Sequence, residues 1–297
     1  MPTLAPKKQA GRFAGVVTRL QDFRRAVAPS VRNFFGHGGL NSSAALAFYF
    51  LLSLLPFLIF LASALAFLPV HHLAERMTSL VSHFVPDQTL PMVRSMLIST
   101  MQSDEKLLSL GFVFAIVAAS NAFAVMMEML DGIYLGEQAR SFWKVRLDAI
   151  YVTIVVGGLT VIALSAVLLG PRFAEELRRA FRISDTFVRI WPETRWLLVV
   201  GCVLASIEVL YYLGPSRRHP LRQQLSGSVF AVAVWIVSSD LLGIYFREFA
   251  YLNAMYGTLT SFIVLMIWLQ LIAAAILMGA ELNVELEKLR KEAAAPA

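Results

Sequence analysis

The sequence predicts an all-α integral membrane protein, a bundle of six transmembrane helices with amphipathic helices at the membrane interface. Its composition is the first reason: of 297 residues, 58% are hydrophobic and 15% are charged. Soluble domains are about 45–50% apolar and about 25% charged. The second reason is the length of six apolar segments, because a helix needs about 20 residues to cross a hydrocarbon core of about 30 Å. These segments lie near 44–68, 107–131, 147–170, 196–213, 225–246 and 257–280.

A basic segment, residues 1–43, precedes the first span and carries seven Lys and Arg residues. Apolar side chains recur in it at helical spacing (Phe13, Val16, Val17 and Leu20). We therefore expect an amphipathic helix that lies against anionic lipid headgroups. The apolar run of the first span exceeds the 7–15 residues of a cleaved signal sequence, which predicts a signal anchor.

Pro56 lies inside the first span, where it should kink the helix because it removes one backbone donor and clashes with the preceding turn. Ser53 stands one turn earlier. The pair is expected either to open a polar notch near mid-membrane, as in transporters with broken helices, or only to shape packing.

Carboxylates inside apolar spans are the most informative residues, because each costs about 2.5–3.5 kcal/mol at mid-span on insertion scales. The second span contains Glu128 with Asn121 seven residues before it, hence on the same face. The fourth and fifth spans contain Glu208 and Asp240. We expect these side chains to face protein or water, with Asp240 nearer the outer side and Glu128 and Glu208 in the cytoplasmic half. The carboxylates are expected to form an acidic cavity that accepts a cation or proton from the cytoplasmic side. The alternative is that each carboxylate pairs with a nearby base and joins two helices.

The ends of spans add further candidates. Glu281 and Asn283 close the sixth span and complete the set of candidate substrate- or ion-binding residues. Since the interface is wet, an ordinary salt bridge is the favoured interpretation for Glu281 and for Asp148. For Glu208 and Asp240 a functional role is favoured, because intramembrane carboxylates are functional by default.

Two amphipathic segments lie between spans, on the side opposite the N-terminus. Their apolar faces comprise Met77, Leu80, Val81 and Phe84 in one segment and Phe173, Leu177, Ala180 and Phe181 in the other. Each is expected either to lie in the headgroup plane or to cap the bundle.

The distribution of basic residues predicts the orientation. The side that includes both termini carries 16 Lys and Arg residues and the opposite side carries 10. The richer side should be cytoplasmic, which places both termini, including the tail 284–297, in the cytoplasm and leaves 44–283 as the membrane domain.

The sequence lacks residues that several classes of enzyme require. All five histidines lie outside the predicted spans, so no span offers a His base to a nucleophile or a His ligand to a buried metal. No phosphate-binding loop or dinucleotide motif occurs. We therefore predict no enzyme activity, no cofactor and no metal. The net charge of +6 is explained by the cytoplasmic loops and does not require a nucleic-acid partner.

Short sequence strings add a family resemblance. In order along the chain they are AALAFY at 44–49, LSLLP at 52–56, RSF at 140–142, LGP at 213–215, YGTL at 256–259 and GAELN at 279–283. Together they resemble the YihY/BrkB family of bacterial inner-membrane proteins, once confused by name with ribonuclease BN. The resemblance implies a multi-pass, six-helix protein of the inner membrane, often described as a transporter, and it supplies neither a catalytic site nor a substrate.

Two functions remain open from the sequence. The first is a permease-like carrier in the lipid bilayer for a small solute, with intramembrane carboxylates as cation or proton sites. The second is a membrane organiser or envelope-integrity factor, associated with virulence or resistance, whose polar residues are structural. The solute and the oligomeric state are not readable from the sequence.

Overall fold

A computed structural model describes residues 7–66, 105–134, 141–169, 184–216, 219–248 and 258–294, with isolated positions at 175, 178, 179 and 182. Over this part of the chain the fold is all-helical, which confirms the predicted class. The helices are α1 (Lys7–Gly36), α2 (Gly39–Ala66), α5 (Glu105–Ile133), α6 (Phe142–Leu169), α8 (Asp185–Leu213), α9 (Leu221–Glu248) and α11 (Thr258–Ala294).

Five helices are long and apolar enough to cross a membrane: Val113–Ile133, Phe142–Val167, Arg189–Leu213, Gln223–Tyr245 and Phe262–Ala293. They overlap the second to sixth predicted spans. The first predicted span falls on α2, of which Gly39–Leu54 counts as a shorter apolar helix. The structure thus supports five spans, and the six-span bundle stays a prediction.

Some predicted features lie outside the described residues. They include the amphipathic segment from Met77 to Phe84, most of the one from Phe173 to Phe181, and the loop histidines at 71, 72 and 83. The predicted N-terminal helix is present as α1.

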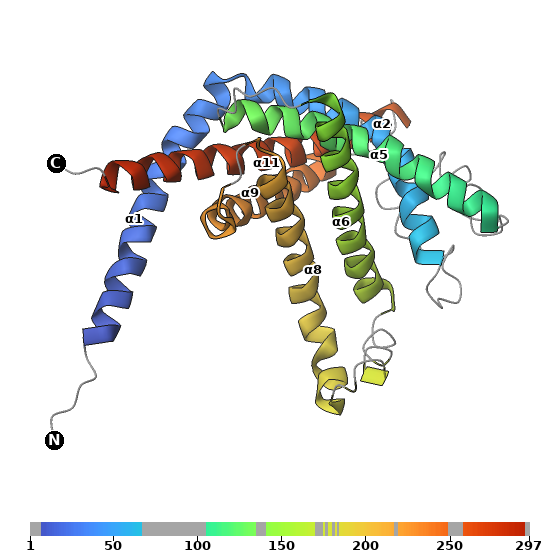
Figure 1. The fold of residues 1–297 in the computed structure, drawn as a ribbon, viewed down its shortest axis with the longest axis horizontal. Helices are drawn as coiled ribbons and strands as arrows, with labels where there is room; N and C mark the ends of the chain where they lie inside the picture. Colours follow the sequence, from blue (N-terminus) through green and yellow to red (C-terminus); the bar gives the residue numbers. More distant parts are fainter. Residues whose placement is uncertain are drawn as a thin grey trace.

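Local chemistry sets where helices begin and end. Gly38 has a positive φ of 73°, a conformation that glycine adopts without steric cost, and it joins α1 to α2. Ser184 caps α8: its side chain accepts a hydrogen bond from the Thr186 backbone N–H. Pro56 interrupts the backbone hydrogen bonds of α2 without ending it, and α2 bends in its second half (Figure 1).

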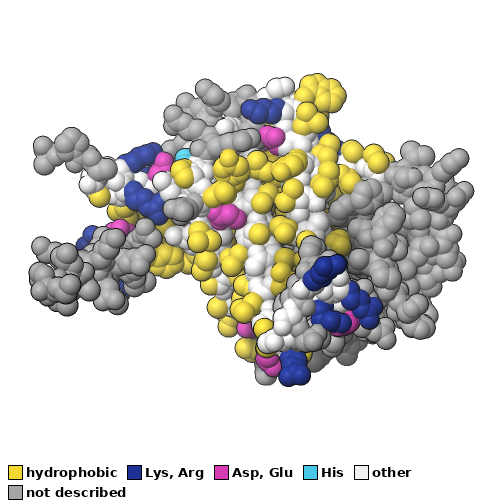
Figure 2. Space-filling view, turned by 60° about the horizontal axis from the view of Figure 1, so that its bottom comes forward, with side chains coloured by type: hydrophobic (Ala, Val, Ile, Leu, Met, Phe, Trp, Pro, Cys, Tyr) yellow, Lys and Arg dark blue, Asp and Glu magenta, His cyan; other side chains and the backbone are white. Residues whose placement is uncertain are grey.

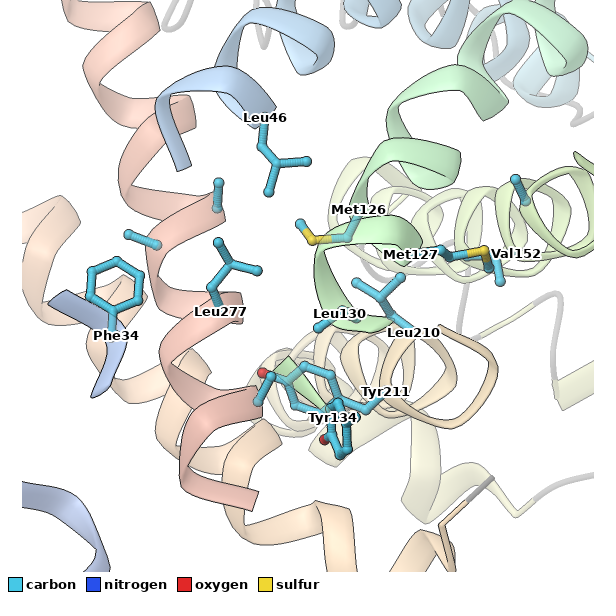
Figure 3. Packing of buried hydrophobic residues seen from close by; sticks show 14 residues of the cluster. Phe34, Leu46, Met126, Met127, Leu130, Tyr134, Val152, Leu210, Tyr211 and Leu277 are labelled. Carbon is cyan, nitrogen blue, oxygen red and sulfur yellow. The ribbon is translucent and has the colours of Figure 1, made fainter. Parts of the chain in front are cut away.

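The helices pack as neighbouring pairs (Figure 1). Helix α11 contacts α9, α2 and α1, helix α5 contacts α2 and α6, and α6 runs beside α8. The main core forms where α2, α5, α8 and α11 meet (Figure 3), and its largest buried side chains include Leu46, Met126, Leu130, Tyr211 and Leu277.

Hydrophobic side chains also cover much of the outer surface, with Lys and Arg gathered toward the edges of the face in Figure 2. Exposed residues on the apolar helices include Phe114, Tyr151, Leu197, Val237 and Leu241. Such a surface is unfavourable in water and favourable against acyl chains, in keeping with helices that cross a membrane.

Candidate functional site

The predicted polar residues of α2 and α5 meet in one cavity, here called the α2–α5–α6 pocket. Its volume is about 500 Å³, and its polar lining consists of Ser53, Asn121, Glu128 and Arg146, with Pro56 beside them. The spacing of Asn121 and Glu128, two helical turns apart on α5, places both on the side of the helix that lines this pocket. Ser53 and Pro56 come from the opposite wall on α2.

Arg146, one turn into α6, binds the middle of α5. Its guanidinium donates to the Asn121 side-chain oxygen and to the Val117 backbone carbonyl, the latter at 2.8 Å. Both acceptors are neutral, so within the described part of the chain the positive charge has no carboxylate partner. In the sequence, Arg146 is only one of the basic residues counted for the orientation. No pattern in the sequence predicts that its side chain lines a pocket.

Glu128 is the other charge in this pocket. Its carboxylate lies within the apolar span Val113–Ile133 and has no hydrogen bond or ion pair with any residue that the structure describes. Nor does it pair with Arg146 across the cavity. One pocket therefore holds two opposite charges that are both available to a ligand.

Glu128 also lines a second cavity, of about 580 Å³, between α1, α2, α5 and α11. This α1–α11 pocket contains Glu281 and His37, whose Nδ1 lies 2.9 Å from Glu281 Oε1. Glu281 is only 2% exposed, so its contact with His37 replaces lost hydration. The contact of Glu281 is therefore made with a histidine in the link between α1 and α2, and it is a salt bridge only when that histidine is protonated.

Two other candidates join helices and do not line either pocket. Ser228 on α9 donates to Glu208 on α8 at 2.5 Å. Asn283 on α11 accepts from the Gly227 backbone N–H at 2.9 Å and donates to the Tyr134 hydroxyl at 3.2 Å. These bonds join helices at their crossings, but the partner of Glu208 is a neutral hydroxyl and not the base that the structural alternative expected.

Helices α9 and α11 cross closely at this place. Gly227 on α9 and Gly279 on α11 bring their backbones together, and a Cβ on either glycine would overlap the carbonyl oxygen of the other. The Tyr211 hydroxyl next to them donates to the Ile276 carbonyl at 2.6 Å. The two glycines allow this close approach because they carry no side chain.

Asp240 stands apart from the other candidates. It is exposed on α9, as Glu128 is on α5, but unlike Glu128 it lines neither pocket. The structure therefore does not bring Asp240 and Glu208 together in one acidic cavity. Among the described residues no three His, Cys, Asp or Glu side chains gather in a way that could hold a metal ion.

Comparisons with known proteins place this geometry in context. A family model described as virulence factor BrkB matches residues 30–297. The ribonuclease-like protein YfkH of Bacillus subtilis is 35% identical over 86% of this chain and 92% of its own length. A UPF0761 membrane protein of Chlorobium phaeobacteroides is 25% identical over 95% of this chain, and one of Idiomarina loihiensis is 24% identical over 62%. The matches cover only 65% and 62% of these two relatives' own lengths. No solved structure matches.

Proposed function

The chain belongs to the virulence factor BrkB family of membrane proteins, and we propose that it is a carrier for a small solute in the bacterial inner membrane, with Glu128 as its cation or proton site. One observation carries the proposal: a carboxylate without a partner among the described residues lies inside a span and lines two cavities. Keeping a charge there is costly unless it meets a polar species, and a bound cation or proton is such a species.

The position of Glu128 suits a carrier better than that of Glu208, to which Ser228 already donates a hydrogen bond and which lines neither pocket. Glu128 lies between a pocket that α6 closes and a pocket that α1 closes. Movement of either helix would change which pocket can reach the carboxylate. This is the arrangement that a solute site needs if it is to face each side of the membrane in turn.

We also propose that both termini lie in the cytoplasm and that the protein is not an enzyme. Helix α1 packs along the second half of α11 through Ala26, Leu282 and Leu286, which supports placing both ends of the chain on the same, cytoplasmic side. His37 and His219 lie in links between helices, outside the candidate spans, so neither serves as a base within the membrane.

Flux measurements on the full chain in liposomes test the carrier. Sodium and proton uptake is followed after a sodium or pH gradient is imposed, for the unchanged protein, for Glu128→Gln and for Glu292→Gln. Glu292 is an exposed residue near the end of α11 and is the matched control. We expect uptake above that of empty liposomes, loss of at least about tenfold in Glu128→Gln, and no change in Glu292→Gln. Uptake equal to that of empty liposomes, or equal in both variants, would refute the cation site.

The organiser is the second candidate, because the polar contacts at Glu208 and Asn283 are already satisfied within the protein. It predicts that Glu208→Ala lowers thermal stability while ion flux stays at the background level in every variant. The carrier predicts the same loss of stability together with flux that depends on Glu128. The two functions are therefore separated by the flux of the unchanged protein.

A further inference from the structure

We propose that the α2–α5–α6 pocket binds an amphipathic zwitterion, with its anionic group at Arg146, its cationic group at Glu128 and its apolar part along the outer wall. The inference rests on the carrier proposed above and names the class of solute for that site. It starts from the two charges that share the cavity without pairing.

Each charge has capacity left for a ligand. An arginine carries five N–H donors, and the described contacts of Arg146 engage its two terminal nitrogens with neutral oxygens. The Glu128 carboxylate keeps all its acceptor sites within the described structure. A purely anionic ligand would be attracted by Arg146 and repelled by Glu128. A purely cationic ligand would be attracted by Glu128 and repelled by Arg146. A zwitterion satisfies both.

The spacing selects among zwitterions. Asn121, which holds the guanidinium, and Glu128 are two helical turns apart, roughly 10 Å along the axis. Each charge-assisted hydrogen bond takes about 3 Å of this distance, which leaves about 4 Å or more between the two charges of the ligand, because the guanidinium also reaches back to the Val117 carbonyl, further from Glu128. A phosphate and an amine joined by a two-carbon link, as in a phosphoethanolamine group, have about this separation. The charges of an α-amino acid are closer together.

The outer wall of the pocket is apolar and open. Tyr49, Leu52 and Phe142 line the pocket and are 39%, 58% and 73% exposed. In a membrane domain such side chains meet acyl chains, so a ligand can keep its charged group inside and its hydrocarbon part against them. This favours an amphipathic zwitterion over one without an apolar part.

Competition for bound lipid tests the inference on the full chain in detergent. Phosphatidylethanolamine and phosphatidylglycerol with identical acyl chains are offered together, and the retained adducts are counted by native mass spectrometry. The variants are Glu128→Gln, Arg146→Gln and Lys144→Gln. Lys144 is exposed on the same turn of α6 but does not line the pocket, so its variant controls for a general loss of basic charge.

We expect the unchanged protein to prefer the zwitterionic lipid, and Glu128→Gln to reduce that preference about fivefold, because it removes the partner of the amine. Arg146→Gln should reduce retention of both lipids, and Lys144→Gln should match the unchanged protein. Since Glu128 makes no hydrogen bond or ion pair with the described residues, Glu128→Gln should change recognition of the ligand without disturbing helix packing. No preference in the unchanged protein, or the same preference in Glu128→Gln, would overturn the inference.

Soluble glycerophosphoethanolamine distinguishes the two sources of this headgroup. Displacement of the lipid by the soluble compound would support recognition of the zwitterion alone and overturn the role of the apolar wall. Failure to displace it would support the amphipathic form. A preference that depends on Glu128, combined with background ion flux, would refute the carrier and leave the binding site. Flux that depends on Glu128 without any lipid preference would support the carrier and refute the zwitterion site.

Discussion

The crossing of α9 and α11 makes the sharpest prediction about stability. Substituting Gly227 by Ala adds a Cβ that would overlap the Gly279 carbonyl oxygen and the Asn283 side chain. The helices must then move apart, which strains the packing and weakens the 2.9 Å hydrogen bond from the Gly227 N–H to Asn283.

The expected cost follows from these two effects. Overpacking a close contact costs about 1–3 kcal/mol, and losing a buried hydrogen bond costs about 0.5–1.5 kcal/mol, so the sum is about 1.5–4.5 kcal/mol. With an unfolding entropy of about 2 cal/mol/K per residue, this corresponds to a drop of roughly 2–7 °C in melting temperature for a chain of this size. The full chain in detergent is heated, and its unfolding is followed by circular dichroism.

Gly201→Ala is the matched control, because nothing lies within 4 Å of the Cβ that it would add. Alanine is favoured over glycine by about 1 kcal/mol inside a helix, so this variant should melt at the same temperature or slightly higher. If Gly227→Ala melted no lower than Gly201→Ala, the close approach of the two backbones would be refuted.

Three further substitutions test single contacts. Asn283→Ala should cost about 1–3 kcal/mol, since it removes the side-chain hydrogen bonds to the Gly227 N–H and the Tyr134 hydroxyl, and an unchanged melting temperature would contradict these bonds. Burial raises the pKa of the Tyr134 phenol above its usual value, so its contribution to stability is present below pH of about 10 and is lost as pH rises further. Melting curves at pH 9 and 11 should therefore differ less in Tyr134→Phe than in the unchanged protein, and an equal difference would contradict this. Ser184→Ala should cost about 0.5–2 kcal/mol, with faster hydrogen exchange at Thr186, and unchanged exchange would argue against the cap.

The sequence predicts where the helices lie along the chain better than it predicts which helices pack together. The length of an apolar run is a local property, and it is enough to identify five of the apolar helices, from α5 to α11. The spacing of Asn121 and Glu128 is also local, and the two residues do line one pocket. Which helix lies opposite depends on packing between distant segments.

The carboxylates illustrate this limit. Glu208 and Asp240 are both acidic residues within apolar spans, and nothing in their local sequence distinguishes them. In the structure Ser228 contacts Glu208, whereas Asp240 is exposed. Arg146 shows the converse: its position near the start of a helix marks only orientation in the sequence, and its reach to Val117 follows from how α6 meets α5.

The contact between Gly227 and Gly279 also limits how this protein can change shape. Two helices whose backbones touch, and which Asn283 joins by a hydrogen bond, neither slide nor separate without losing that fit. Helices α9 and α11 therefore behave as one rigid frame. Any rocking motion falls to the other helices, among them α6 and α1, which line the two pockets that share Glu128.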